Sequence, residues 1–387
     1  MAAGGAERVS RGARPPALEA SDGGRRAAAD PMAVEAVSGL LERLAPLRAK
    51  RRGLSLRWFD EWCAPLEEAL AALPEMPACP HDLFRTLMLN PSPTRKRACL
   101  VADREGPVAI IGLRRRGPYW QPVTQWTAPG GIAPAREGLL FRALEALGTP
   151  VRIPGWHGPL PSSRLVRDVR SAAVYKIDCR ADFREHWRRS GQWRFIQKAQ
   201  RRTQGFDFAV DGEGAAEWTV RGWAERWRDD PARQAVVASD LLLAAEYFQK
   251  RGRLHTFTLL DGGAPVAGDL CFLRDDELVS SVIFREPGYD WHGAGTRLTE
   301  LVTEWAAGRG IAKFDLGAWE PYKAGWAPED GIEWRFSVCP LPVHLVERAI
   351  WKREALIARA RGLVAGLTHR GKPVPAGGVR SLEEETQ

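Results

Sequence analysis

Short apolar runs alternate with turn signals in the C-terminal half of the chain, a pattern typical of β-strands. The runs span Arg253 to Leu260, Val266 to Leu273 and Leu278 to Phe284. Asp261-Gly262-Gly263 separates the first two runs and is a hairpin turn signal. Asp275-Asp276 turns the chain again before the third run. The pattern therefore predicts a meander of neighbouring strands.

A glycine-containing loop and a helix follow the meander. The loop runs from Pro287 to Gly295, and the helix from Thr296 to Ala307 has Leu298, Leu301, Val302 and Trp305 at helical spacing. Ile311 to Leu316 is the next apolar run and predicts a further strand. Glycines let backbone N–H groups approach a phosphate, and the start of a helix favours negative charge. The Gly293-Ala294-Gly295 segment therefore predicts an anion-binding loop.

Ionisable side chains gather where this last strand ends. They are Asp315, Glu320, Tyr322 and Lys323. Side chains of this kind at the end of a strand mark the place where α/β folds usually bind ligands. We expect the four groups to converge on one cleft.

Each of the four has a structural alternative. Glu320 is a candidate general base, or else the salt-bridge partner of Lys323. Tyr322 is a candidate proton donor to a departing thiolate, or else a packed ring. Asp315 either orients Lys323 or an acceptor amine, or bonds backbone N–H groups at the strand end. Lys323 is expected to bind an anionic phosphate or the acceptor.

Composition places the chain among globular proteins with room for two domains. It has 387 residues, of which 44% are hydrophobic. No apolar run approaches the ~20 residues that a transmembrane helix needs. The Cys residues are scattered without a CxxC pair and the His residues show no ligand spacing, so we expect no metal. Such isolated thiols indicate a reducing compartment, and we expect a cytoplasmic protein.

The two ends of the chain differ from its middle. Residues 1–31 are rich in Gly, Ala and Arg and contain no secretory signal, so we expect a disordered tail. Residues 341–372 are expected to form a C-terminal helix, amphipathic and basic from about Pro342 to Leu367. This helix either packs on the body or contacts an anionic membrane surface. Residues 373–387 are expected to be disordered.

Residues 32–180 predict a first unit of strands and helices. Helices are expected over Phe84 to Met88 and Leu139 to Leu147, and strands over Ala98 to Ala102, Val108 to Leu113, Val151 to Pro154 and Val174 to Ile177. This order of elements echoes the later half, although no residue-level repeat is visible. A degenerate tandem duplication is one interpretation of that order.

A strongly basic segment lies between the two units. Arg184 to Arg202 predicts one helix, in which basic residues alternate with Trp187, Trp193 and Phe195. One interpretation is an aromatic stripe in the core with a solvated arginine face. The other is a surface for phosphate or RNA, because arginine and stacking aromatics serve both. The net charge of +8 also favours anionic ligands.

Residues 181–340 resemble the acyltransferase domain of the GNAT superfamily. The resemblance rests on the Gly293-Ala294-Gly295-Thr296 loop with its helix, and on Phe314-Asp315-Leu316-Gly317 followed by Glu320-Pro321-Tyr322-Lys323. Within the superfamily the chain is most similar to the branch resembling bacterial cellulose-biosynthesis acetyltransferases and FemAB-type transferases. It departs from the general pattern at Asp290, where Gln or Arg is common.

The resemblance implies acetyl-CoA or another acyl-CoA as cosubstrate, with direct attack by the acceptor. The strand that ends in Ile283 and Phe284 would contact the pantetheine arm through its backbone. The loop residues that would hold the pyrophosphate are Gly288, Gly293, Ala294, Gly295 and Thr296. The residues that would act in catalysis are Glu320, Tyr322, Asp315 and Lys323.

The sequence thus predicts an α+β protein of two GNAT-like halves, residues 32–180 and 181–340, with mixed sheets flanked by helices. The predicted function is transfer of an acetyl or other acyl group to an amine or hydroxyl acceptor, either a small molecule or a glycan. Polysaccharide or cell-envelope metabolism is the context that the resemblance suggests. Two alternatives stay open. One is a FemAB-like transferase that uses aminoacyl-tRNA. The other is a GNAT-fold scaffold that has lost catalytic activity, which the acidic Asp290 in the loop suggests.

Overall fold

The first half of the chain supplies one end of the molecule. The computed structural model describes residues 49–50, 53–75, 80–91, 94–116, 119–123, 132–134, 140–147, 149–157, 160–227, 238–318, 320–339, 341 and 344–345. The elements of the first half are β1 (Ser55–Phe59), α2 (Ala64–Ala71), α3 (His81–Leu89), β2 (Lys96–Ala102), β3 (Pro107–Arg116), β4 (Tyr119–Pro122), β5 (Ile132–Pro134), α4 (Leu140–Leu147), β6 (Val151–His157) and β7 (Val166–Asp178). The helices and strands expected in this half are all present.

The second half supplies the other end. Its elements are α5 (Phe183–Ser190), α6 (Gln192–Arg202), β8 (Asp207–Val210), α7 (Ala215–Arg226), α8 (Ala238–Gln249), β9 (Leu254–Asp261), β10 (Ala264–Arg274), β11 (Glu277–Arg285), the 3₁₀ turn η2 (Pro287–Tyr289), α9 (Ala294–Gly308), β12 (Lys313–Ala318), the 3₁₀ turn η3 (Pro321–Gly325) and β13 (Glu329–Val338). The predicted meander is β9, β10 and β11, and the predicted helix after the loop is α9.

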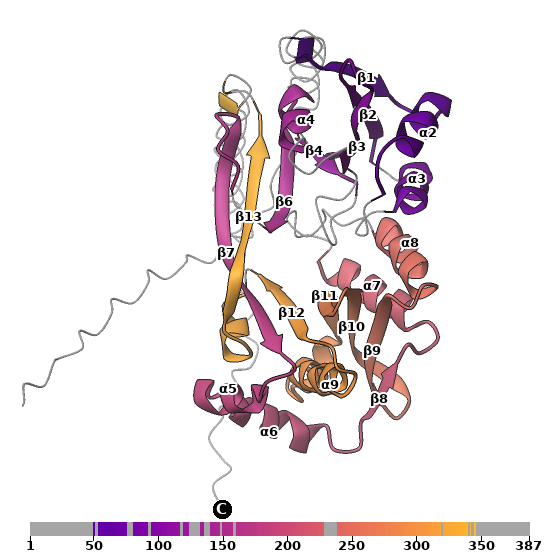
Figure 1. Ribbon diagram of the computed structural model, residues 1–387. Coiled ribbons are helices and arrows are strands. Elements are labelled where there is room, and N and C mark those ends of the chain that lie inside the picture. Colours follow the sequence, from indigo (N-terminus) through magenta and orange to yellow (C-terminus); the bar gives the residue numbers. More distant parts are fainter. Residues whose placement is uncertain are drawn as a thin grey trace, which may run out of the picture.

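The described strands form one mixed sheet. Its order is β1-β2-β3-β4-β6-β13-β7-β12-β11-β10-β9-β8, with β5 against β3. Figure 1 shows the two ends of this sheet far apart, joined by the long strands β7 and β13. β7 comes from the first half but pairs with β12, while β13 comes from the second half but pairs with β6. The halves therefore exchange one strand each, which the sequence pattern did not predict.

The same arrangement of strands occurs twice. In the second half β11 is antiparallel to β10, and after α9 the chain returns as β12, parallel to β11. In the first half β4 is antiparallel to β3, and after α4 the chain returns as β6, parallel to β4. These are the two parallel pairs among the described strands. The fold is thus α+β with two halves of matching topology, as expected.

Helices cover both faces of the second half of the sheet. One face packs on α9, α5 and α6, through a cluster that includes Phe257, Cys271, Leu298, Trp187 and Ile196. The opposite face packs on α7 and α8, through a cluster that includes Leu270, Val282, Val220 and Leu241. Ala267 and Cys271 of β10 lie in the first cluster while Leu270 and Phe272 lie in the second, as strand alternation requires.

A buried polar cluster fastens the two halves together. Asp240 of α8 accepts hydrogen bonds from Lys96 Nζ at 2.9 Å and Asn90 Nδ2 at 2.6 Å, and Arg114 lies 3.6 Å away. Burial lowers the pKa of Lys96, and it lowers that of Arg114 to about 10. α3 also contributes Leu83 and Leu87 to the apolar core around α8. The contact between the two halves is therefore made by both apolar and ionic side chains.

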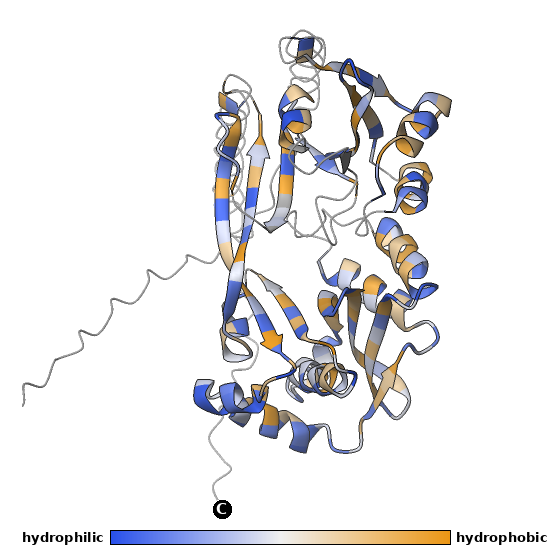
Figure 2. Cartoon of the chain, viewed as in Figure 1, coloured by the Kyte–Doolittle hydropathy of each residue, from blue (hydrophilic) through white to orange (hydrophobic). Residues whose placement is uncertain are grey.

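The prediction of one helix from Arg184 to Arg202 is wrong. The segment forms α5 and α6, which meet at Gly191. Gly191 has a φ of 81°, a left-handed conformation that ends the first helix. Both helices are mainly hydrophilic (Figure 2), as their arginine content requires. The expected tail of residues 1–31, the region around Met32, residues 373–387 and nearly all of the expected C-terminal helix lie outside the described residues.

Candidate functional site

β11 and β12 separate in the middle of the sheet. They pair in parallel from Glu277–Lys313 to Val279–Asp315, and their described pairing ends there. Past this point β12 is irregular, because Gly317 has a φ of 75° and the register with β7 shifts between Asp315 and Ala318. We call the ends of β11 and β12 beyond Val279 and Asp315, where their described pairing has stopped, the fork. The fork lies at the position where the sequence predicted a ligand.

β11 contains a β-bulge beside the fork. Leu270 of β10 pairs with Val282, but Cys271 pairs with Ser280, so Ser281 is an extra residue in β11. A bulge leaves one residue outside the regular ladder and re-aims its neighbours, which is why bulges recur at active sites. The bulge thus takes Ser281 out of the regular ladder with β10 close to the point where β11 and β12 part.

A buried carboxylate lies beneath this bulge. Asp269 of β10 is 1% exposed and accepts a hydrogen bond of 2.8 Å from Ser280 Oγ. The Cys271 thiol also bonds to it, and the positive charge of Lys323 acts on it. Burial raises the pKa of Asp269 to about 6, despite the opposing effects of Ser280, Cys271 and Lys323. Asp269 therefore changes its charge near neutral pH.

Lys323 enters the fork from the other side. Its ammonium donates to the Ala318 carbonyl at 3.2 Å. An added Cβ at Gly317 would lie 3.6 Å from Lys323 Nζ. Burial lowers the pKa of Lys323, while the charges of Glu320, Asp315, Glu333 and Asp269 oppose that change. The fork thus brings a partly buried lysine within electrostatic range of a buried aspartate.

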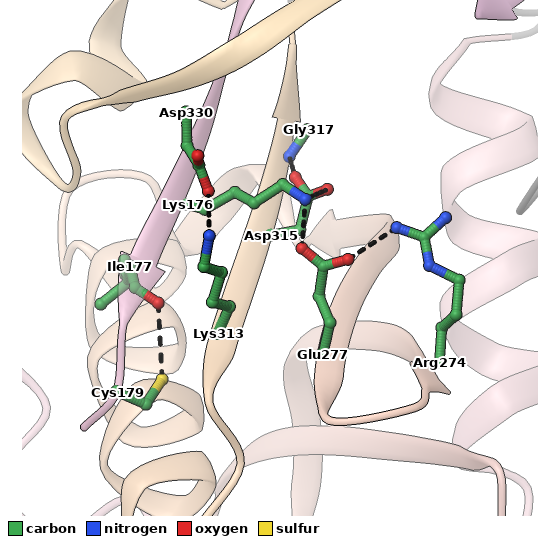
Figure 3. A network of polar contacts seen from close by, with 9 residues as sticks. All are labelled: Lys176, Ile177, Cys179, Arg274, Glu277, Lys313, Asp315, Gly317 and Asp330. Carbon is green, nitrogen blue, oxygen red and sulfur yellow. Dashed lines mark hydrogen bonds and ion pairs between the residues drawn. The ribbon is translucent and has the colours of Figure 1, made fainter. Parts of the chain in front are cut away.

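Asp315 belongs to a chain of ion pairs shown in Figure 3. Its Oδ1 accepts from the Gly317 amide at 2.6 Å, and its Oδ2 lies 3.6 Å from Lys176 Nζ. Lys176 is also paired with Glu277, which accepts from Arg274 at 2.6 Å. These contacts fix the turn at the end of β12. Asp315 is therefore held in place close to Lys323 and contributes negative charge there.

The other two predicted catalytic residues flank Lys323. Glu320 precedes η3, and its carbonyl accepts from the Lys323 amide at 3.0 Å. The side chain of Glu320 adds to the negative potential at Lys323. Tyr322 is 61% exposed, so its ring is largely in solvent. The structure brings Asp315, Glu320 and Lys323 together, whereas Tyr322 lies at the surface of the same turn.

The loop before α9 provides backbone donors. Gly293 is the N-cap residue of α9, with a φ of 74°, and no described side chain caps this helix. The first amides of a helix have no partner within it, and here they belong to Ala294, Gly295 and Thr296. Ala294 is fully buried, so the start of α9 faces protein as well as solvent. Uncapped donors at a helix start suit an anionic group.

Asp290 does not leave an unbalanced negative charge in this loop. It is paired with Arg285, the last residue of β11. An added Cβ at Gly295 would meet Arg285 Cδ at 3.5 Å, an ordinary contact with a flexible side chain. At Gly293 the added Cβ would lie 3.1 Å from Ala199 Cβ, and the left-handed backbone would be strained as well. The two glycines therefore differ: Gly293 is required by the fold, and Gly295 is not.

The remaining predicted cofactor residues lie along the approach to the fork. Ile283 is 37% exposed, whereas the ring of Phe284 packs on Trp218 of α7, with ring centroids 5.1 Å apart. Gly288 is exposed in η2. Thus Ile283 and Gly288 are accessible, and Phe284 contributes its backbone to the strand while its side chain holds α7.

Aromatic and basic side chains border the loop. Trp291 is 69% exposed; Arg202 lies over its ring at 3.5 Å from the centroid, and Lys198 at 5.6 Å. Phe195 of α6 is 61% exposed. By contrast Trp326 is buried against Trp187, with centroids 5.3 Å apart, and belongs to the core.

Sequence reasoning missed Asp269 and Ser280. Both lie inside apolar runs that predict strands, so neither was a candidate functional residue. The sequence did contain one indication: a carboxylate in the middle of a predicted buried strand needs hydrogen-bond or charge partners. Within the described residues no cluster of His, Cys, Asp and Glu could hold a metal ion. None of the described helices is long and apolar enough to cross a membrane.

Comparison with known proteins identifies the second half. Residues 182–324 match the sequence family described as an acetyltransferase (GNAT) domain, so the chain contains a GNAT-type domain, as predicted. No curated protein sequence matches the chain.

Solved structures with similar architecture have low sequence identity. One is the C-terminal domain (DUF2156) of a putative lysylphosphatidylglycerol synthetase from Agrobacterium fabrum, with 13% identity, 74% of this chain and 96% of that chain covered, and a TM-score of 0.44. Another is a tandem GNAT protein from the clavulanic acid biosynthesis pathway, with 13% identity, 73% and 98% covered, and a TM-score of 0.41. FemX has 10% identity, 76% and 100% covered, and a TM-score of 0.41.

Proposed function

We propose that the protein transfers an acetyl or other acyl group from acyl-CoA to an amine or hydroxyl acceptor. The observation that carries this proposal is the fork, which lies next to the uncapped start of α9. A thioester substrate needs its pyrophosphate held, its carbonyl placed beside a nucleophile and one proton removed. The fork and the α9 start together offer a place for each of these tasks.

Particular backbone groups of the chain bind the acyl-CoA in this proposal. The amides of Ala294, Gly295 and Thr296 bind the pyrophosphate. The backbone of β11 from Ser281 to Ile283, which lies past the described end of its pairing with β12, contacts the pantetheine arm. This path ends beside Asp269 and Lys323, where the thioester and the acceptor meet.

Calorimetric titration with CoA and acetyl-CoA tests the proposal. Gly295→Val places a side chain between the α9 amides and the ligand, so we expect affinity to fall about tenfold or more. The matched control is Gly308→Ala, at the other end of the same helix, where an added Cβ meets nothing within 4 Å. Equal CoA affinity in the parent and the control, with affinity about tenfold or more lower in Gly295→Val, supports the proposal. A parent that binds neither CoA nor acetyl-CoA refutes it.

A second candidate is transfer from aminoacyl-tRNA, in the manner of the FemAB-like branch. The exposed Phe195 and Trp291, set among Arg202 and Lys198, support it, because stacking aromatics beside cations suit single-stranded nucleic acid. Binding of tRNA that weakens steeply between about 50 mM and about 200 mM salt would favour this candidate. The scaffold alternative rested on Asp290, and the charge of Asp290 is balanced by Arg285.

A further inference from the structure

Asp269 and Ser280 form a polar pair inside an otherwise apolar layer. Asp269 lies on the β10 face that packs on α9, between Ala267 and Cys271, which both belong to that core. Its carboxylate is buried, yet a neutral side chain would fit an apolar core at lower free energy. Ser280, in contrast, is only partly buried, so its hydroxyl connects the hidden carboxylate to the fork.

We propose that Asp269 accepts the proton released by the attacking nucleophile, and that the Ser280 hydroxyl relays this proton. The inference rests on the acyl transfer proposed above and adds to it a residue that the sequence did not suggest. In this proposal the nucleophile approaches Ser280 Oγ, which already donates to Asp269 Oδ1. Asp269 acts through Ser280, so it is a positioning and proton-accepting residue.

The chemical step balances without another reactant. The nucleophile forms a bond to the thioester carbonyl carbon, and the carbonyl π pair moves to oxygen. As the nucleophile loses its proton to Ser280 Oγ, the Ser280 proton passes to Asp269 Oδ1. When the tetrahedral intermediate collapses, the C–S bond breaks and CoA leaves as a thiolate, which takes the proton back along the same path. The products are the acylated acceptor and CoA.

The groups around Asp269 fit this role. Phe257 of β9 and Ile283 of β11 pair beside it and are apolar. Cys271 is a thiol whose own pKa is raised well above its usual value by burial and by Asp269, so it stays protonated. Lys323 of η3 carries the opposing positive charge. The raised pKa of Asp269, about 6, therefore lets this carboxyl exchange a proton near neutrality.

Other carboxylates near the fork are less suited to accept a proton. Asp315 is held by the Gly317 amide and lies close to Lys176, contacts that favour its charged form. Glu277 is likewise held by Lys176 and Arg274, and its pKa lies below the usual value. Both are committed to the ion-pair chain, whereas Asp269 has one neutral hydroxyl donor and a thiol.

Release of the CoA thiol from acetyl-CoA tests the proposal. The nucleophiles are water alone and then ethanolamine, glucosamine and lysine, with rates measured from about pH 5 to about pH 8. We expect the parent rate to rise through about pH 6, because Asp269 must be ionised to accept a proton. Asp269→Asn should lose this rise and at least about a hundredfold in rate, while its CoA affinity stays within about twofold.

Two further variants separate a relay from a packing effect. Ser280→Ala should lose rate like Asp269→Asn, and Ser280→Thr, which keeps the hydroxyl, should recover most of it. Gly308→Ala, at the far end of α9 where an added Cβ meets nothing within 4 Å, is the control and should keep the parent pH profile. The relay is overturned if Asp269→Asn keeps the parent rate and profile. It is also overturned if the parent binds acetyl-CoA but releases no thiol above background with any of these nucleophiles. Failure to bind CoA would instead contradict the proposed function.

Discussion

Ser280, the residue just before the bulge in β11, donates a hydrogen bond of 2.8 Å to Asp269. The bond links a carboxylate that is almost wholly buried to the end of β11 that no longer pairs with β12. Burial raises the pKa of Asp269 to about 6, from a usual value of 3.8. The folded protein therefore holds a proton at Asp269 over a range of pH in which the unfolded chain has lost it.

This pKa predicts how stability depends on pH. Burial of the charged Asp269 carboxylate lowers the free energy of unfolding. Because the folded pKa is raised, this loss of stability is absent below about pH 4, grows as pH rises, and is complete above about pH 6. Asp269→Asn removes the charge but keeps the shape and an acceptor for Ser280. Relative to the parent, we expect this variant to gain roughly 2 kcal/mol more at about pH 8 than at about pH 4.5. Urea unfolding at the two pH values measures the difference, and a gain that is equal at both would contradict the raised pKa.

Asp240 should be essential to the contact between the halves. Asp240→Ala leaves Lys96 and Arg114 buried without their counter-charge, so we expect a loss of about 3–5 kcal/mol in the free energy of unfolding. The control is Glu246→Gln, which breaks an exposed pair with Lys250 on the same helix and should change stability by less than about 0.5 kcal/mol. Chemical denaturation followed by tryptophan fluorescence checks both. Equal, small effects would show that the halves do not depend on this cluster.

Gly222 of α7 allows close packing of Phe284. An added Cβ at Gly222 would lie 2.2 Å from Phe284 Cε1, so Gly222→Ala must displace a ring on β11. We expect a loss of about 1–3 kcal/mol, as is usual when a packed core is overfilled. Gly308→Ala, in open space, is the control and should be nearly neutral or slightly stabilising. Thermal unfolding distinguishes them, and an unchanged melting temperature for Gly222→Ala would mean that α7 and β11 move apart freely.

Arg285 and Asp290 should act as a pair in CoA binding. Arg285→Met leaves Asp290 as an unbalanced negative charge beside the α9 start, and we expect affinity for CoA to fall about tenfold. Adding Asp290→Asn should restore most of this loss, because the repulsive charge is then gone. Calorimetric titration of the single and double variants gives the coupling. If the double variant binds as weakly as Arg285→Met, the guanidinium itself contacts the ligand and the neutralising role is refuted.

Local patterns in the sequence were sufficient for the elements around α9. The meander, the glycine loop, the helix and β12 all follow from alternation, turn signals and helical spacing, which are local properties. The break between α5 and α6 was readable in principle, because Gly191 interrupts an otherwise helical run. The exchange of β7 and β13 was not readable, since which strands pair across the molecule depends on contacts between residues distant in sequence.

The candidate site shows the same limit. Asp315, Glu320 and Lys323 were visible because they cluster in sequence at a strand end, and the structure keeps them together. Asp269 comes within electrostatic range of Lys323 because the folded sheet places β10 beside β11, next to the bulge at Ser281. A bulge of one residue leaves no clear mark in the pattern of apolar positions, so the carboxylate was read as part of an ordinary strand.

Hydrogen–deuterium exchange with and without acetyl-CoA tests the proposed donor site most directly. If the donor binds along β11 and at the α9 start, added protection should concentrate in peptides that cover 277–297 and 313–326, with smaller changes in the first half of the chain. Acetyl-CoA that binds tightly but protects neither region, or protects mainly the first half, would contradict the assignment of the fork as the site of acyl transfer.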